Sequence, residues 1–154
     1  MKSKQIALIG VFAALYYVLG IVFQPIGFML IQCRVACALI PLIALFGYPA
    51  TIGITIGHLL FNLNSPLGTL DYLSPFIFLI PRYLIQRYGT IAIPIHTLSV
   101  GAWVGYLLMT QLPPEFRPYS FTVAFLTVTI GETVAEWFLG YVLIVPLIKR
   151  RITP

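Results

Sequence analysis

Long apolar stretches follow one another along this chain, and short segments rich in proline, glycine or charge separate most of them. About 20 consecutive apolar residues are enough to cross the hydrocarbon core of a bilayer as a helix. Proline and glycine interrupt such stretches most strongly, and the clearest interruption is the proline-rich segment 113–118. The pattern predicts six transmembrane helices, at residues 6–23, 28–46, 50–63, 69–86, 90–112 and 119–148.

Charged residues are too few for a soluble protein of this length. Hydrophobic residues make up 60% of the 154 residues and charged residues only 8%, whereas a soluble domain needs far more polar surface to cover its core. No segment is long and polar enough to form a soluble domain. We therefore predict an all-α integral membrane bundle of six transmembrane helices, with residues 1–154 forming a single transmembrane domain.

Basic residues are distributed as expected for a multi-pass protein of the plasma membrane. The net charge of +5 comes from residues near the ends of the apolar stretches and not from one stripe, which argues against a nucleic-acid partner. Cytoplasmic connections carry an excess of lysine and arginine. Most basic residues fall on the side of the two termini: Lys2, Lys4, Arg82, Arg87, Lys149, Arg150 and Arg151. Only Arg34 and Arg117 fall on the other side, so both termini are predicted to be cytoplasmic, whereas a five-helix alternative places one basic terminus outside.

Polar residues gather where the third apolar stretch ends. The segment Asn62–Gly68, NLNSPLG, falls on the outer side, and the stretch before it has only about 14 residues, fewer than a full span needs. Irregular backbone at membrane depth is tolerated where it lines a polar cavity, so we expect an outward-facing recess there. The alternative is an external loop in which Asn64 or Ser65 caps a helix. Asp71 follows, either as the partner of a helix dipole or as an acceptor for ligand N–H groups.

Two glutamates lie inside the last apolar stretch. Glu132 and Glu136 are four residues apart and share one helix face, and ionisable groups inside a membrane usually face a partner, a cavity or a pathway. With a rise of about 1.5 Å per residue, Glu132 lies near mid-membrane, which suits the floor of an outward-facing pocket. The alternative is a structural pair with one of four basic side chains: Arg34, Arg82, His58 or His96.

Gln32 and Arg34 open the second apolar stretch on the outer side. Arg34 is either a residue that snorkels to the membrane interface or a clamp for an acceptor edge of a ligand. His58 lies in the middle of the third stretch, where a histidine is more often a satisfied core residue than a ligand-binding one. We rank His58, Asn64 and Glu136 as lesser candidates for a binding site.

Several kinds of chemistry lack their motifs. There is no G-x-x-x-x-G-K-[ST] loop, so the chain does not hydrolyse nucleotide itself, and no H-E-x-x-H or G-x-S-x-G motif. Cys33 and Cys37 are spaced poorly for a disulfide and belong to no Cys-x-x-Cys motif. We expect no enzymatic activity, no metal and no cofactor.

The first apolar stretch has a face of small residues. Ala7, Gly10 and Ala14 lie three and four residues apart, near its cytoplasmic end. Small residues let helices approach closely in lipid. The face serves either to dock another membrane protein or to pack within the chain.

Four segments together resemble the QueT transporter family: AALYYVL, IQCRVACALIPL, IGHLLFNLNSPLGTLDYL and VTIGETVAEWFLGYVLIVPL. They cover nearly the whole chain, and the N-x-x-SPLG-x-x-D block is the most specific part. Members are substrate-binding (S) components of energy-coupling factor transporters associated with queuosine precursors. The resemblance implies a six-helix bundle with a pocket near the outer face and a deazaguanine-type ligand. It also implies docking through the first helix onto a membrane scaffold coupled to two ATPases.

The resemblance also implies roles for particular residues. Candidate substrate-binding residues are Gln32, Arg34, Asn62, Asp71 and Glu132, and candidate docking residues are Ala7, Gly10 and Ala14. One departure is Cys37, because an acidic residue commonly stands there in the family.

We therefore expect a binding subunit that captures a queuosine precursor outside and delivers it through a partner-driven conformational change. One alternative is a solitary ion-coupled carrier that uses Glu132 and Glu136 as proton relays. Others are an S component for another vitamin-like compound and a purely structural membrane subunit.

Overall fold

The computed structural model describes residues 3–27, 33–118, 120–144 and 146, and every regular element within them is helical. The elements are α1 (Ser3–Val22), α2 (Gln24–Gly27), η1 (Val35–Leu42), α3 (Ile43–Phe46), α4 (Tyr48–Asn62), η2 (Thr69–Leu73), α5 (Ser74–Ile77), α6 (Leu79–Tyr88), η3 (Gly89–Ala92), α7 (Ile93–Gln111), η4 (Pro114–Phe116), α8 (Phe121–Thr133) and η5 (Val134–Ile144). The η elements are 3-10 helices, except that η5 is a π-helix.

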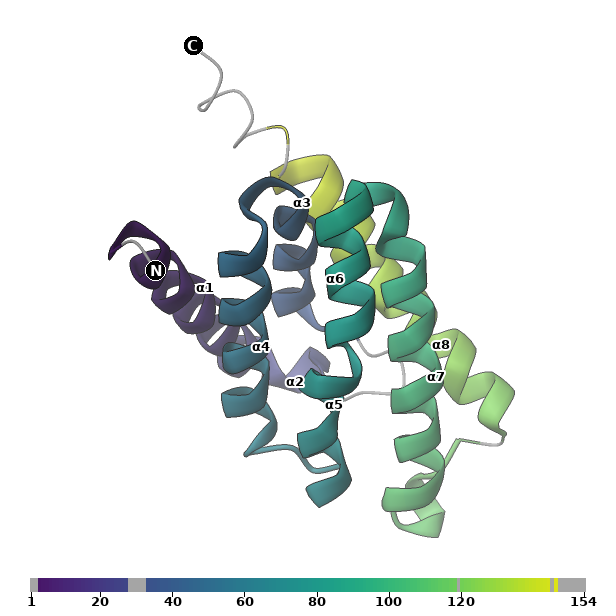
Figure 1. Cartoon of the computed structure of the whole chain (residues 1–154). Coiled ribbons are helices and arrows are strands. Elements are labelled where there is room, and N and C mark those ends of the chain that lie inside the picture. Colours follow the sequence, from purple (N-terminus) through teal and green to yellow (C-terminus); the bar gives the residue numbers. More distant parts are fainter. Residues whose placement is uncertain (1–2, 28–32, 119, 145, 147–154) are drawn as a thin grey trace.

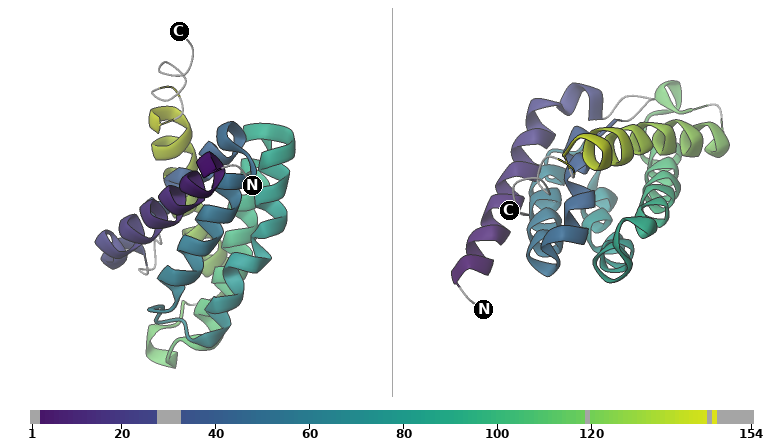
Figure 2. Two further views of the ribbon diagram at one scale, coloured as in Figure 1. Left: turned by 60° about the vertical axis from the view of Figure 1, so that its left-hand side comes forward. Right: turned by 90° about the horizontal axis from the view of Figure 1, so that it is seen from above.

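Within the described part of the chain, consecutive elements join into six helices that alternate in direction (Figure 1). They are α1, η1 with α3, α4, η2 with α5 and α6, η3 with α7, and α8 with η5. The connections from α3 to α4 and from α6 to α7 lie at one end of the bundle, and those from α4 to η2 and from α7 to α8 lie at the other. Seen from above, α1 covers one side of the bundle and α8 with η5 crosses another (Figure 2).

Among the residues that the structure describes, three helical runs are long and apolar enough to cross a membrane: Ser3–Val22, Thr69–Gln111 and Phe121–Val142. The second run has 43 residues and turns back at Gly89, whose φ of +75° is a conformation that favours glycine. Val35–Phe46 is also apolar but shorter. The predicted all-helical fold is therefore confirmed, whereas six membrane crossings with cytoplasmic termini stay a prediction.

The second predicted helix is less regular than its apolar pattern indicates. Residues 28–32 of the predicted range 28–46 lie outside the described part, and the helix begins at Val35 in 3-10 form, with Pro41 inside it. A proline inside an α-helix removes a hydrogen bond and clashes with the preceding turn. Regular α-helix accordingly begins only at Ile43.

The last predicted helix changes its form halfway. It begins after Ser120, whose hydroxyl accepts a hydrogen bond from the Val123 amide at 3.3 Å and so caps the helix. From Val134 to Ile144 the backbone follows the wider π-helical pattern. Such turns are rare and are frequently found at functional sites. Here the change begins two residues after Glu132.

Glycines of α4 let α1 approach it closely. A Cβ added at Gly57 would lie 2.5 Å from the Ala13 carbonyl oxygen, and one added at Gly53 would lie 2.6 Å from that of Ile9. Contact between helix backbones through small residues is typical of helices packed in lipid. Any larger residue at these glycines therefore forces α1 away from α4.

The protein exposes apolar side chains and buries charged ones. Ile80 and Ile91 are 72% and 80% exposed, whereas Arg34 is 3% exposed and Arg82 is fully buried. Such an exterior suits a lipid environment better than water, where large exposed apolar patches are rare. Arg34 is therefore not an interfacial snorkelling residue.

Burial also corrects the count of basic residues at the two membrane surfaces. The sequence assigns Arg82 to the cytoplasmic side and Arg34 to the outer side, but both side chains are buried and both contact His58, so neither counts as an exposed charge at a membrane surface. Without these two residues, Arg117 alone remains on the outer side. The cytoplasmic side keeps six basic residues: Lys2, Lys4, Arg87, Lys149, Arg150 and Arg151. The predicted orientation keeps its support from the charges.

Candidate functional site

A set of buried polar side chains, here called the polar interior, lies within the helix bundle. Its members are Arg34, Thr51, Thr55, His58, Asn62, Asp71, Ser74, Arg82, His96, Thr97, Glu132 and Glu136. A buried polar group without a partner costs about 1–3 kcal/mol. Members of this set that lack a partner within the chain are therefore the strongest candidates for contact with a ligand.

Asp71 lies at the centre of one hydrogen-bonded group. The Ser65 hydroxyl donates to one oxygen of its carboxylate at 2.5 Å, and the Ser74 hydroxyl donates to the other. The Trp103 indole N–H donates to the Ser74 oxygen at 2.7 Å, which ties α7 to this group. Both carboxylate oxygens of Asp71 are thus engaged within the chain, in addition to any ligand they contact.

The two asparagines of the NLNSPLG segment differ in position. Asn62 is fully buried at the end of α4, and its side-chain N–H donates to the main-chain oxygen of Asp71 at 2.8 Å. Its side-chain oxygen has no hydrogen-bond partner among the described residues. Asn64 is exposed. Asn62 therefore has an acceptor available in the interior, whereas Asn64 does not face it.

A second group contains two arginines and a histidine. The Nε2 atom of His58 lies 2.5 Å from Arg34 Nη1, and its Nδ1 atom lies 2.9 Å from Arg82 Nη2. Arg82 also donates to the Thr55 hydroxyl at 3.0 Å. The Arg34 guanidinium lies over the Phe61 ring, 5.2 Å from its centroid. This group concentrates positive charge in the interior.

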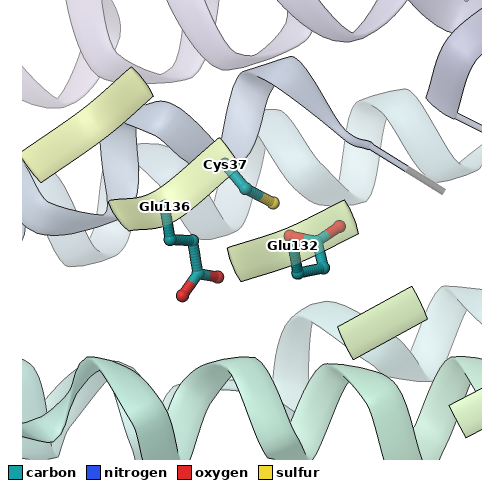
Figure 3. A group of neighbouring side chains, drawn as sticks. All are labelled: Cys37, Glu132 and Glu136. Carbon is teal, nitrogen blue, oxygen red and sulfur yellow. The ribbon is translucent and has the colours of Figure 1, made fainter. Parts of the chain in front are cut away.

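Glu132 has the least satisfied side chain of the polar interior. It is fully buried, and neither carboxyl oxygen makes a hydrogen bond of normal geometry with a described residue. The Cys37 thiol and the Arg34 main-chain amide are nevertheless near enough to interact with it. Figure 3 shows Glu132 and Glu136 projecting from the last helix, with Cys37 beside them. A ligand with N–H donors would find both oxygens of Glu132 available.

Glu136 is held by α7. One oxygen lies 2.6 Å from His96 Nδ1, and the other accepts a hydrogen bond from the Thr97 hydroxyl at 2.7 Å. One ligand atom from each of Cys37, Glu132 and Glu136 lies within 4.8 Å of the others, so these three residues could hold a metal ion. An ion at that position would compete with His96 and Thr97 for Glu136.

Most candidate residues from the sequence meet in the polar interior: Arg34, Asn62, Asp71, Glu132, and the lesser candidates His58 and Glu136. Gln32 lies outside the described residues. The burial of these side chains is established, whereas their roles in binding stay predictions.

Sequence reasoning considered Arg82 only as a possible structural partner of the glutamates or as a surface charge, and it missed the contacts of Arg82 with His58 and Thr55. The signal was present, because Arg82 lies within an apolar stretch and an ionisable residue inside a span indicates a functional position. Ser74 and Trp103 carry no comparable signal, since serine and tryptophan are ordinary residues in membrane helices. Only the fold places them around Asp71.

An apolar exterior, long apolar helices and an ionisable interior define a multi-pass helical membrane protein. The family model of the QueT transporter matches residues 6–149, and the chain belongs to this family. It is therefore a transport protein and not an enzyme. No curated protein and no solved structure matches the chain.

Proposed function

We propose that this protein is the membrane-embedded substrate-binding component of an energy-coupling factor importer in the plasma membrane. It captures a queuosine precursor, a deazaguanine-type base, at the outer face. Partner subunits, a membrane scaffold with two ATPases, then drive uptake. Membership of the QueT family supports the queuosine precursor, and the asymmetric basic residues support six spans with both termini in the cytoplasm.

The observation that carries the proposal is the buried Glu132 carboxyl group, which lacks hydrogen-bond partners of normal geometry among the described residues. A deazaguanine ring presents two neighbouring N–H donors, one on the ring and one on the 2-amino group. A carboxylate accepts two such hydrogen bonds with its two oxygens. Glu132 is therefore the group that receives the donor edge of the base.

Other members of the polar interior complement the rest of the base. The free side-chain oxygen of Asn62 accepts a further N–H, and the Arg34 guanidinium faces a carbonyl oxygen. Gln32 completes the candidate set from the sequence, and Asp71 holds the end of the site through Ser65 and Ser74. The aromatic rings around His58 and Arg34 suit a flat heterocycle.

Binding by the purified protein tests this function. We expect 7-deazaguanine, its aminomethylated form or its nucleoside to titrate the full-length protein and to raise the midpoint of thermal unfolding. A ligand at 100 times its Kd stabilises the folded state by about 2.7 kcal/mol. Riboflavin, thiamine and biotin serve as controls. Stabilisation by one of these vitamins and by no deazaguanine would overturn the proposed substrate.

The exposed face of α1 supports the proposed docking onto a scaffold. Ala7, Gly10 and Ala14 are all exposed, and a Cβ added at Gly10 would meet no atom within 4 Å. The opposite face of α1 is the one packed on α4. The small residues are thus available to a partner helix, which small-residue faces suit in lipid.

Enlarging this face separates docking from substrate binding. We expect Ala14→Leu, alone or with Gly10→Leu, to abolish co-purification with the scaffold, because the added side chain prevents close helix contact. Affinity for the deazaguanine should stay within about twofold of wild type. Ala102→Leu, the same change on the exposed side of α7, is the matched control. Retained co-purification in both α1 variants would contradict the docking role.

A solitary ion-coupled carrier is the second candidate. The observation that favours it is the buried His96–Glu136 pair, with Glu132 nearby, because such side chains form proton relays in other carriers. Uptake into proteoliposomes without any ATPase, lost when the proton gradient is collapsed, would favour this candidate. Uptake only with the ATPases present would favour the importer.

A further inference from the structure

We propose that Cys37, Glu132 and Glu136 form a binding site for a thiophilic divalent cation, with Zn²⁺ as the best fit, and that this ion and the base exclude each other. The ion site is argued from these side chains alone, whereas the exclusion rests on the proposed function of Glu132. The sequence alone gives no indication of the site, because Cys37 is remote from both glutamates in the chain and only the fold brings the three together (Figure 3).

The three side chains already lie close to metal-binding geometry. One ligand atom from each lies within 4.8 Å of the others: Sγ of Cys37 and one carboxylate oxygen of each glutamate. In a tetrahedral zinc site, Zn–S bonds of about 2.3 Å and Zn–O bonds of about 2.0–2.2 Å place such atoms about 3.5 Å apart. Side-chain rotations that bring the atoms about 1 Å closer together therefore complete the site.

Glu132 is the independent indication that a ligand belongs here. It is fully buried, and neither of its carboxyl oxygens has a hydrogen-bond partner of normal geometry among the described residues. One of these oxygens belongs to the cluster with Cys37 and Glu136. A buried unpaired carboxylate is costly, so carboxylates in protein interiors are paired or coordinate a metal. An ion at the cluster would supply the partner that Glu132 lacks.

Neighbouring side chains orient the other two ligands, as they do in most metal sites. The Tyr16 hydroxyl lies 3.5 Å from Cys37 Sγ and can donate to a thiolate. The Thr97 hydroxyl donates to one oxygen of Glu136, and His96 Nδ1 contacts the other oxygen. The ion competes with these two contacts, but a carboxylate has about four lone-pair sites, so Glu136 can bind the ion and keep one of them.

Charge and ligand type select the ion. The buried residues that the structure describes include three carboxyl groups and two guanidinium groups: Asp71, Glu132, Glu136, Arg34 and Arg82. With ionised carboxyl groups and neutral histidines, this interior carries one net negative charge, and a divalent cation bound to a thiolate cancels it. The thiol releases its proton when the ion binds. Thiolate ligands favour Zn²⁺, whereas Mg²⁺ and Ca²⁺ prefer oxygen ligands and higher coordination numbers.

The ion and the base compete for the same carboxyl group. Under the proposed function, the donor edge of the base engages both oxygens of Glu132. An ion bound to one of these oxygens removes at least one of the two hydrogen bonds and places positive charge against the N–H edge. The site therefore holds either the base or the ion.

Cobalt tests the ion site directly, because a thiolate bound to Co²⁺ gives a charge-transfer absorption band that oxygen ligands do not give. The full-length protein, freed of its purification tag and treated with a chelator, should show this band with Co²⁺ and lose it when Zn²⁺ is added. We expect Cys37→Ser to abolish the band and to weaken Zn²⁺ binding about tenfold or more. Cys33→Ser is the matched control and should keep the band, because Cys33 is only partly buried and lies outside the cluster.

Glu136→Gln provides a second variant if Cys37→Ser does not fold. It removes a charged ligand from another helix, so Zn²⁺ binding should again weaken about tenfold or more, although the thiolate remains. A wild-type protein without the thiolate band, or a band that persists in Cys37→Ser, would overturn the ion site.

Competition with the base tests the exclusion. Saturating Zn²⁺ should raise the apparent Kd of 7-deazaguanine about tenfold or more in the wild-type protein, and about twofold or less in Cys37→Ser. An apparent Kd that Zn²⁺ leaves unchanged in the wild-type protein would overturn the exclusion while the proposed function stands. Absence of any deazaguanine binding would overturn the proposed function and the exclusion with it, and the cobalt spectrum would still decide the ion site.

Discussion

Glu132→Gln should weaken deazaguanine binding at least tenfold and leave the ligand-free protein as stable as wild type or more stable. An amide side chain has one acceptor oxygen instead of two, so one of the two hydrogen bonds from the base is lost, and the NH2 group faces a ligand donor. Glu132→Ala removes both acceptors and should reduce affinity further. The measurements are a titration with 7-deazaguanine and thermal unfolding without it.

The stability of the ligand-free Glu132→Gln variant separates a binding role of Glu132 from a structural role. The Glu132 carboxyl group is fully buried without hydrogen-bond partners of normal geometry among the described residues. Burying an unpaired charged group is costly, and an amide reduces that cost. Glu115→Gln is the matched control, because Glu115 belongs to the exposed element η4 between α7 and α8. Lower stability with unchanged affinity would show that Glu132 only supports the bundle.

Asp71→Ala should reduce stability strongly and weaken deazaguanine binding at least tenfold. The substitution leaves the hydroxyls of Ser65 and Ser74 without their common acceptor. Hydrogen bonds to a charged group contribute about 1.5–3 kcal/mol each, so loss of the two bonds should lower the free energy of unfolding by about 3–6 kcal/mol. Denaturant unfolding in detergent measures this change, and titration measures the affinity.

Two comparisons interpret the Asp71 result. Ser65→Ala removes one donor and should cost less than Asp71→Ala. Thr69→Ala is the control, because Thr69 is exposed and belongs to η2, the element that contains Asp71. Unchanged affinity in both Asp71→Ala and Glu132→Ala would contradict the proposed site as a whole.

The helical fold was predictable because its signal is repeated along the chain. Each apolar stretch is bounded by glycine, proline or charge, and the described backbone adopts positive φ at three of these breaks, Gly47, Gly68 and Gly89. Local irregularity was not predictable. The apolar pattern alone does not distinguish an α-helix from the 3-10 helix at Val35–Leu42, where Pro41 is a local signal in the sequence. Nor does it distinguish an α-helix from the π-helix at Val134–Ile144, which depends on packing between helices.

The candidate site was predictable in its residues but not in its pairings. Rare ionisable residues in an apolar chain indicate Glu132 and Asp71 directly. Partners depend on which helices become neighbours, and Glu136 illustrates this, because its hydrogen bonds reach His96 and Thr97, about 40 residues earlier in the chain. For Arg82 the sequence was misleading, because a count of charges for membrane orientation treats every arginine as a surface residue.

The position of Trp103 provides the molecule with an internal optical probe. The chain has two tryptophans, and the indole of Trp103 is anchored to the serine that donates to Asp71. The other, Trp137, makes an edge-to-face contact with Tyr141 in the last helix. Replacing Trp137 with phenylalanine leaves Trp103 as the single tryptophan, and its emission wavelength, excited selectively over the nine tyrosines, follows hydration and bonding around Asp71. Events at this end of the bundle can then be followed in time without attaching a dye.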